Sequence, residues 1–501
     1  MIRALILSVA IGLTWSHADV SRPNILLVLI DDMGPMDSSL PFLADADGKP
    51  VKHPLNEFYH TPEMEKLAAL GFRSSRFYAN SVCSPTRASL MNGQSAARHR
   101  TTQWIHPEGR NRGKHDPEDW NWEGLGKKDV TLPRLLQAAG YRTIRCGKGH
   151  FAPFDHEGSD PRDIGFDVNI AGGSIGRPSS FYGEDGYGHI RGTSKTHKVP
   201  GLENYRGTET YLTEALTLEL KKALSDAVEA KQPFFAYMSH YAVHSPFHAD
   251  PRFKDRYEEK EDRGKNEVAY ATMVEGIDKS LGDLIRHIES LGVSEDTLVI
   301  FLGDNGSDAP MGNTHGHSSS APLRGKKGTH YEGGMRVPFI AAWAKPSGEA
   351  HVQKRFPIAR DVIESETIGT VHDLFPTILR VTGVEAPAGH ALDGASLWPW
   401  LAGKEAVQPQ RFLMHFPHSH RSSYFTVLID DYNKLIWHQL KNGPDRFQLF
   451  DLKKDPYELE NLASSRPDLL KEMRELMAEE MLQVDAPAPK GVDIRAALLG
   501  P

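Results

Sequence analysis

Two acidic pairs in the sequence have the residue types and positions needed to bind a metal ion. Asp31-Asp32 and Asp304-Asn305 each follow an apolar run of strand length. Adjacent carboxylates repel each other unless a positive charge holds them, and oxygen ligands without His or Cys suit a hard cation, Ca²⁺ before Mg²⁺. Turn or helix-cap residues are the competing interpretation for either pair alone. Two pairs at equivalent strand ends favour the cation site.

A third cluster, the segment CSPTR at residues 83–87, could bind an anion. Pro85 suits the first turn of the helix predicted to follow, which places Cys83 at the helix N-terminus. Free N–H groups and the helix dipole favour negative charge there. Arg87, one turn later, could donate two hydrogen bonds to sulfate or phosphate oxygens.

The fourth cluster supplies positive charge and proton transfer. Lys148 and His150 follow a strand-like run that contains Cys146, and His244 follows the apolar run PFFAYM. Lysine provides a point charge, and histidine exchanges protons near neutral pH. The chain has 24 histidines, most of which we expect to be structural or on the surface. The shared position after a strand singles out His150 and His244.

The elements that must position these clusters alternate between helices and buried strands. We predict strands at residues 24–30, 141–146, 233–238 and 297–302, and helices at 63–70, 131–139, 209–230, 267–291 and 370–382. This alternation predicts an α/β core with a large, mostly parallel sheet flanked by helices. Sites in such sheets form beyond the carboxyl ends of the strands, so the four clusters are expected to converge.

The remaining segments are of two kinds. Residues 111–122 and 172–198 are rich in Gly, His, Arg and Asp without periodicity, and are interpreted as surface loops that line a binding cleft or as poorly ordered insertions. From about residue 411, short alternating runs predict an antiparallel sheet, followed by a helix at 466–484. We therefore predict a catalytic domain at 19–403 and a smaller C-terminal α+β subdomain at 404–501, with the boundary near Gly403.

Length and charge restrict the function classes. The chain has 501 residues and a formal net charge of 58 − 66 = −8, which argues against a basic surface that binds nucleic acid. Residues 1–18 have the features of a cleavable signal peptide, with cleavage predicted after Ala18. The apolar run is too short for a spanning helix, so no stable membrane anchor is expected. We predict a periplasmic or secreted protein.

The order of the motifs resembles that of the type I sulfatases, of the alkaline phosphatase superfamily. CSPTR matches their C/S-x-P-x-R signature, in which the cysteine is oxidised after translation to formylglycine. NILLVLIDDMG, GKGH, HSPF, LGDNG and APLRGKKGTHYEGGMRVP are similar to further family motifs in the same order, and FQLFDLKKDPYELENLA resembles the family's C-terminal motif. The resemblance covers nearly the whole mature chain and implies an alkaline-phosphatase-like fold.

The resemblance also implies residue roles. The ligands of Ca²⁺ would be Asp31, Asp32, Asp304, Asn305 and the formylglycine at position 83. Arg87 and Lys148 would neutralise the nucleophile and the sulfate, and His150 would assist breakdown of the intermediate. His244 and Lys327 would face the leaving-group oxygen. Lys327 aligns with the lysine of the family's RGGKG, whereas Lys326 replaces a glycine and would reach substrate or solvent.

The implied reaction is hydrolysis of a sulfate ester, with a formylglycine geminal diol at position 83 as the nucleophile. A formylglycine-generating maturation enzyme would be a partner. A phosphate or phosphonate ester hydrolase of the same superfamily is the alternative. A carbohydrate-binding protein with an inactive site is a third interpretation, which the presence of every expected catalytic group disfavours.

Substrate binding and the cysteines complete the predictions. A sulfated sugar or polysaccharide is the expected substrate of a soluble exported sulfatase, and RFLMHFPHSHRSS resembles a stretch of carbohydrate-directed relatives. The candidate sugar contacts are His99, His315, His317, His415, His418 and His420, with ordinary loop histidines as the competing view. Two cysteines in an exported chain first suggest a disulfide, but modification of Cys83 would leave Cys146 as a buried, inert thiol. Gly149 replaces a bulky Trp of the family and is expected to leave space beside Lys148 and His150 that another side chain or the substrate must fill.

Overall fold

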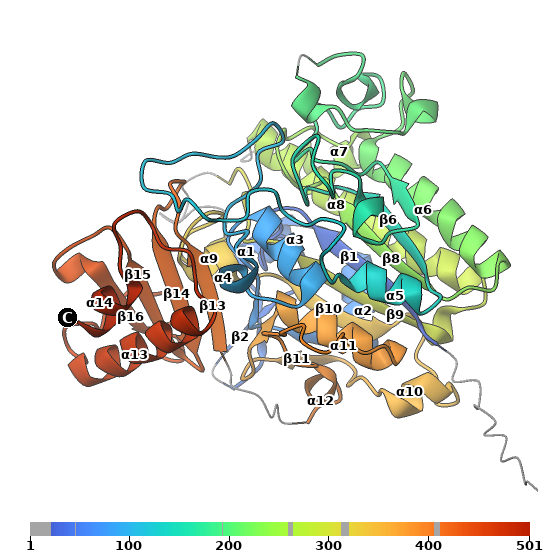
Figure 1. The fold of residues 1–501 in the computed structure, drawn as a ribbon. Helices are drawn as coiled ribbons and strands as arrows, with labels where there is room; N and C mark the ends of the chain where they lie inside the picture. Colours follow the sequence, from blue (N-terminus) through green and yellow to red (C-terminus); the bar gives the residue numbers. More distant parts are fainter. Residues whose placement is uncertain are drawn as a thin grey trace, which may run out of the picture.

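An eight-stranded mixed sheet forms the centre of the molecule (Figure 1). The computed structural model describes residues 22–45, 47–192, 194–258, 264–311, 320–404 and 411–500. In spatial order the strands are β11 (Val362–Glu364), β4 (Phe72–Ser74), β10 (Phe339–Trp343), β9 (Thr297–Gly303), β1 (Asn24–Ile30), β8 (Phe234–His240), β6 (Arg142–Gly147) and β7 (Val168–Ile170). Neighbouring strands are parallel except where β10 pairs with β9 and β4.

The central strand β1 has no polar face because both faces of the sheet are covered. Leu26, Val28 and Ile30 belong to one hydrophobic core, and the residues that alternate with them belong to the other. Side chains of successive strand residues point to opposite faces. A continuous apolar run such as NILLVLI is therefore what a doubly covered parallel strand requires.

Helices cover the two faces of the sheet. On one face lie α2 (Pro62–Leu70), α6 (Leu212–Glu229) and α8 (Lys265–Ser290). On the other lie α3 (Cys83–Asn92), α5 (Leu132–Ala138), α11 (Leu374–Thr382) and α12 (Trp398–Leu401). The predicted α/β fold is confirmed. The helix predicted from residue 370 begins at Leu374, because Thr370 and Asp373 form a capping box around a 3-10 turn at Val371–Asp373.

Short elements connect these layers. They are α1 (Pro54–Phe58), α4 (Ala96–His99), α7 (Lys254–Glu258), α9 (Glu332–Met335), α10 (His351–Arg355), and the small strand pairs β2 (Leu43–Ala44) with β3 (Pro50–Val51) and β5 (Phe77–Tyr78) with β12 (Gly369–Thr370). The predicted loop at 172–198 contains 3-10 turns at Gly186–Gly188 and Lys195–His197. No helix within the described ranges is long and apolar enough to cross a membrane. The predicted signal peptide lies outside those ranges.

A second, antiparallel sheet lies beside the large one (Figure 1, red). It contains β13 (Arg411–Phe416), β14 (Phe425–Asp430), β15 (Asn433–His438) and β16 (Phe447–Asp451), in that order. One face packs against Tyr78, Val82 and Met335 of the large domain, and the other against α13 (Pro467–Gln483) and α14 (Ile494–Leu499). The predicted antiparallel sheet and helix are confirmed. The domain boundary near Gly403 stays a prediction.

Candidate active site

The four polar clusters meet at one edge of the large sheet. The strands β9, β1, β8 and β6 are consecutive neighbours, and each one is followed by one of the predicted groups of residues. Asp31 follows β1, Asp304 follows β9, Lys148 follows β6, and His244 follows β8 after a short turn. The expectation that the carboxyl ends of parallel strands would bring these residues together is confirmed.

The carboxylates form a buried cluster. Asp31, Asp32 and Asp304 each offer an oxygen that lies within 4.8 Å of the other two. Asp32 is held by two contacts: its backbone N–H donates to Asp304 Oδ1 at 3.0 Å, and its Oδ1 accepts from Asn305 Nδ2 at 2.9 Å. Asp32 also has a φ of 63°, a left-handed conformation that aspartate tolerates better than most residues.

Each carboxylate contacts a cation. Lys148 Nζ lies 2.6 Å from Asp31 Oδ2, and Lys327 Nζ lies 2.6 Å from Asp32 Oδ1. Arg87 donates from Nε and Nη2 to Asp304 Oδ2, at 3.0 and 2.7 Å. Its Nη1 donates to the backbone oxygen of Lys148 and to Ser239 Oγ. Three positive groups therefore balance three carboxylates, and all six side chains are buried.

The pKa values reflect burial opposed by these ion pairs. Burial raises the pKa of Asp31 and of Asp304 to about 6, although Lys148 and Arg87 partly oppose it. Burial alone would raise the pKa of Asp32 as well, but Lys327, His244 and Lys148 together hold it below its ordinary value. A further positive charge at the cluster would favour the ionised form of all three carboxyl groups.

The donor set fits a hard cation. Asp31 Oδ1 and Asn305 Oδ1 are buried, and neither has a hydrogen-bond partner among the residues that the structure describes. Buried oxygens are seldom left without a partner, so two at one site are consistent with a ligand that accepts their lone pairs. All donors are carboxylate or amide oxygens, which Ca²⁺ and Mg²⁺ prefer.

Cys83 and His150 are in direct contact. Cys83 begins α3, with Val82 as the helix cap, and its Sγ lies 3.3 Å from His150 Nδ1. His150 Nε2 lies 2.6 Å from the carbonyl oxygen of Ile105, which can only accept, so Nε2 carries the proton. Burial, reinforced by the charge of Lys148, lowers the pKa of His150 well below its ordinary value. A neutral ring therefore presents its unprotonated Nδ1 to position 83.

His244 and Lys327 lie beside Asp32. His244 Nε2 is 3.6 Å from Asp32 Oδ2, and its Nδ1 donates to the carbonyl oxygen of Ser245 at 3.0 Å. Burial and the charge of Lys327 lower the pKa of His244 to about 3. Burial alone would lower the pKa of Lys327, but Asp32 and other nearby negative groups raise it above its ordinary value. Lys327 is therefore protonated while His244 is neutral.

A cavity of about 320 Å³ opens above Cys83. It is lined by Cys83, Trp104, His106, Pro107, His150, Gly176, Arg177, Thr196, His197, His244, Lys327, His420 and Arg421. Four of the six predicted catalytic residues are in this lining. The other two, Arg87 and Lys148, are fully buried and are bound to the carboxylates.

Most of the predicted sugar-contacting histidines that the structure describes lie outside the cavity at Cys83. Of the four described, only His420 lines it. His99 Nε2 bonds Ser89 Oγ, and His418 bonds Thr102 and lies 3.3 Å from Asp116. Both ring nitrogens of His415 are used, by Thr426 Oγ1 and the carbonyl oxygen of Pro487. His315 and His317 lie outside the described residues.

The sequence reasoning missed several cavity residues. Arg421 follows His420 and donates to both oxygens of Asp308 and to the backbone oxygen of Lys327. The small domain therefore completes the wall of the cavity. Lys326 is predicted to reach either the substrate or solvent. In the structure its Nζ lies 3.6 Å from Asp308 Oδ1. The remaining missed residues, among them Trp104, Arg177 and His197, come from loops where no periodicity marks a direction. The amino-acid composition of these loops was the only sequence signal that they could line a cavity.

The space beside Gly149 is filled by backbone and not by another side chain or the substrate. A Cβ at this position would lie 2.5 Å from the carbonyl oxygen of Gly173, whose backbone therefore occupies the volume. The same carbonyl accepts a hydrogen bond from His150 N at 2.8 Å. The missing side chain thus lets the 172–198 loop pack directly against the residues that follow β6.

Both cysteines are free and buried, so the expected absence of a disulfide agrees with the structure. Cys146 lies in β6, and its Sγ is 3.3 Å from the carbonyl oxygen of Leu216. Burial raises the pKa of its thiol above the ordinary value. An un-ionised thiol in a packed core is unreactive, as predicted for this residue.

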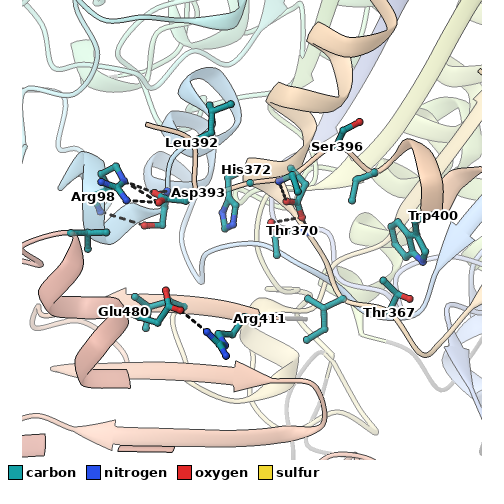
Figure 2. Close-up of a pocket in the computed structure, with 18 of the residues that line it drawn as sticks. Arg98, Thr367, Thr370, His372, Leu392, Asp393, Ser396, Trp400, Arg411 and Glu480 are labelled. Atoms are coloured by element: carbon teal, nitrogen blue, oxygen red, sulfur yellow. Dashed lines mark hydrogen bonds and ion pairs between the residues drawn. The ribbon is translucent and has the colours of Figure 1, made fainter. Parts of the chain in front are cut away.

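A larger cavity, of about 490 Å³, lies between the two domains, and none of the predicted catalytic or metal-binding residues lines it. Several of its charged side chains are paired with each other (Figure 2). Arg98 binds Asp393, and Arg411 binds Glu480 at 2.9 Å. The predicted catalytic residues that line a cavity are found in the one at Cys83.

Comparison with known proteins identifies two family models along the chain. The model described as "Sulfatase" matches residues 23–384, which include all the strand-end clusters. The model described as "N-sulphoglucosamine sulphohydrolase, C-terminal" matches residues 326–486. The two matches together span nearly all of the described residues.

Two relatives and one solved structure are also similar to this chain over most of its length. The N-acetylgalactosamine-6-sulfatase of Mus musculus is 30% identical over 407 residues, covering 79% of this chain and 69% of the relative. A sulfatase of Formosa agariphila is 25% identical and covers 93% and 90% of the two chains. The crystal structure of Ps i-CgsB in complex with k-i-k-neocarrahexaose superposes with a TM-score of 0.69 at 24% identity, covering 92% of this chain and 93% of that chain.

Proposed function

Because the chain belongs to the sulfatase family, whose members are sulfuric ester hydrolases, we propose that the cavity at Cys83 releases inorganic sulfate from a sulfated carbohydrate. The observation that carries this assignment is the contact between Cys83 and the unprotonated Nδ1 of His150 at 3.3 Å, at the floor of a cavity beside a buried carboxylate cluster. This contact supports residue 83 as the nucleophile and His150 as the base, beside a proposed cation site.

We propose that Ca²⁺ binds Asp31, Asp32, Asp304 and Asn305 together with residue 83, and that Cys83 is converted to formylglycine by a maturation enzyme. When present, the hydrated aldehyde supplies an oxygen nucleophile and Ca²⁺ supplies positive charge. The buried oxygens of Asp31 and Asn305 that lack hydrogen-bond partners support the cation site. The mass of the peptide containing residue 83 tests the modification: active protein should carry the aldehyde, and full activity with unmodified cysteine would contradict it.

His150 acts as the base at position 83. Its Nε2–H donates to the Ile105 carbonyl oxygen, which fixes the tautomer and aims Nδ1 at residue 83. The lowered pKa keeps the ring neutral and ready to accept a proton. His150→Gln should therefore retain the fold and lose most turnover.

Lys327 and His244 face the leaving-group oxygen. Of the two, Lys327 holds a proton that it can donate to a departing alkoxide, and neutral His244 orients the group. Arg87 and Lys148 hold Asp304 and Asp31 in place from beneath the cavity. Their charges also favour the negative charge that develops on the sulfuryl oxygens.

A carbohydrate substrate is supported by the name of the mouse relative and by the neocarrahexaose bound in the structural neighbour. The phosphate or phosphonate alternative gains no support, because nothing in the carboxylate cluster or the comparisons favours it over sulfate. We also propose that residues 1–18 direct export to the periplasm or the medium, which N-terminal sequencing of the mature protein would test.

The activity test compares two esters of one phenol. Purified protein in buffer with Ca²⁺ is given 4-nitrophenyl sulfate or 4-nitrophenyl phosphate, and a panel of sulfated mono- and oligosaccharides is then assayed for sulfate release. We expect sulfate ester turnover at least about tenfold above phosphate ester turnover, and release of sulfate from some sugars of the panel. Preference for the phosphate ester would overturn the proposed function.

A further inference from the structure

The wall of the Cys83 cavity carries positive charge without acidic side chains. Among the described residues that line it, three are lysine or arginine, five are histidine, and none is aspartate or glutamate. This contrasts with the chain as a whole, whose formal net charge is −8. A cavity of this kind concentrates positive potential on an anionic ligand.

The three permanent cations differ in how they are paired. Lys327 binds Asp32 beneath the cavity, and both oxygens of Asp308 accept from Arg421. Arg177 makes no hydrogen bond or ion pair with any residue that the structure describes. It is nevertheless only partly exposed, so its guanidinium offers free donors inside the cavity.

Arg177 lies next to the reaction centre. The preceding residue, Gly176, packs so closely against His150 that a Cβ there would be 3.0 Å from Cε1 of the imidazole. On the other side, the charge of Arg177 adds to burial in lowering the pKa of His197, which also lines the cavity. Arg177 is therefore next in sequence to a residue that contacts the proposed base, and its charge acts on His197 of the same loop.

We propose that Arg177 binds a second anionic group of the substrate, a carboxylate or another sulfate, beside the sulfate that is hydrolysed. This inference rests on the proposed function and names the substrate class of the same site: a sugar with two anionic groups. The planar guanidinium can donate two parallel hydrogen bonds to either oxyanion. No acidic neighbour competes for those donors among the described residues, so the substrate is the partner they lack.

The same loop offers a matched control. Arg191 also lies between residues 172 and 198, but its side chain is 81% exposed and lies 3.5 Å from Asp185. It is absent from the cavity lining. Arg191→Ala therefore removes the same charge from the same segment without touching the site, and Arg177→Lys keeps the charge while losing the two-pronged donor.

The test measures binding without turnover. Cys83→Ala protein in buffer with Ca²⁺ is titrated calorimetrically with matched pairs of sugars: a monosulfated hexosamine alone, with a second sulfate, or linked to a uronic acid. We expect one type of second anion to tighten binding by about 10- to 100-fold, the range of a charge-assisted hydrogen bond. The preferred pair then distinguishes sulfate from carboxylate.

The variants decide the assignment. Arg177→Ala in the same background should abolish the preference, Arg177→Lys should keep part of it, and Arg191→Ala should keep it whole. No preference for a second anion in any pair, or a preference that survives Arg177→Ala, would overturn the inference. Release of sulfate from 4-nitrophenyl sulfate by the wild-type protein is scored separately. Absence of sulfate release would contradict the proposed function. The role of Arg177 would still be decided by the binding titrations.

Discussion

Replacing Lys434 by Met tests how the two domains are joined. Lys434 lies in β15 and is fully buried, with its Nζ 3.0 Å from Glu332 and 2.7 Å from Glu458. Glu332 also accepts from the Tyr78 hydroxyl at 2.9 Å, and its backbone N–H donates to Glu458 at 2.7 Å. One lysine of the small sheet thus neutralises a carboxylate of the large domain and one from the segment after β16.

The size of the stability loss expected for Lys434→Met follows from the burial of Lys434 and its two glutamates. Methionine has nearly the same length as lysine but leaves two buried carboxylates without their cation. Removing one partner of a buried pair costs about 3–5 kcal/mol. A matched control is Lys471→Met on α13, whose side chain is 76% exposed and lies 3.8 Å from Glu475. An exposed pair of this kind contributes about 0–1 kcal/mol, so the control should change stability little.

The deficit of the Lys434 variant should depend on pH. Burial raises the pKa of Glu458 to about 7 in the folded protein, above the unfolded value of about 4.3. A carboxyl group with a raised folded pKa loses stability as pH rises between those two values. Lys434 lowers the folded pKa values of Glu458 and Glu332, so removing it should raise both. The variant should therefore lose more stability at pH 8.5 than at pH 5.5.

The assay is urea unfolding followed by tryptophan fluorescence, at pH 5.5 and 8.5. We expect Lys434→Met to lower the free energy of unfolding of the small domain by about 3–5 kcal/mol at pH 8.5. Adding Glu458→Gln should restore part of the loss, because it removes one uncompensated carboxylate. A change below about 1 kcal/mol, or a deficit equal at both pH values, would refute the reasoning.

Two further predictions concern the site. Arg87→Lys keeps the charge but cannot make both hydrogen bonds to Asp304. Asp304 would then bind the metal ion less well, so the chelator concentration that halves activity should fall about 10- to 100-fold. An unchanged chelator titration would contradict the positioning role of Arg87. Gly149→Trp introduces the residue type that the motif resemblance implies for the family, but it forces a Cβ to within 2.5 Å of the Gly173 oxygen. It should destabilise the protein by about 1–3 kcal/mol and reduce turnover, whereas wild-type stability and turnover would show that the loop can move aside.

The strand-end residues could be predicted because parallel strands force their carboxyl ends together. Once residues 24–30 and 297–302 are assigned as buried strands, Asp31 and Asp304 must lie at one edge. The sequence does not show that Arg87 and Lys148 lie beneath the cavity instead of lining it. The position of each cation depends on which carboxylate it contacts, and that contact is set by the tertiary structure.

Other features had no sequence signal. Arg177 and Trp104 lie in loops, where side-chain direction follows from tertiary packing and not from a repeating backbone geometry. Lys434 precedes the apolar run Leu435–Trp437, and a lysine is seldom fully buried, yet the structure buries this one against two glutamates. The histidines of HFPHSH share one segment, but His415 in β13 points to Pro487 while His420 reaches the cavity.

The central claim is that residue 83 carries out sulfate ester hydrolysis in this cavity. The most direct measurement is the time course of inorganic sulfate release from 4-nitrophenyl sulfate by wild-type protein and by Cys83→Ala, with folding of both checked by circular dichroism. The account predicts steady release by the wild-type protein and at least about a thousandfold less by the variant, since loss of a nucleophile removes the covalent route. Comparable release by folded Cys83→Ala would contradict it.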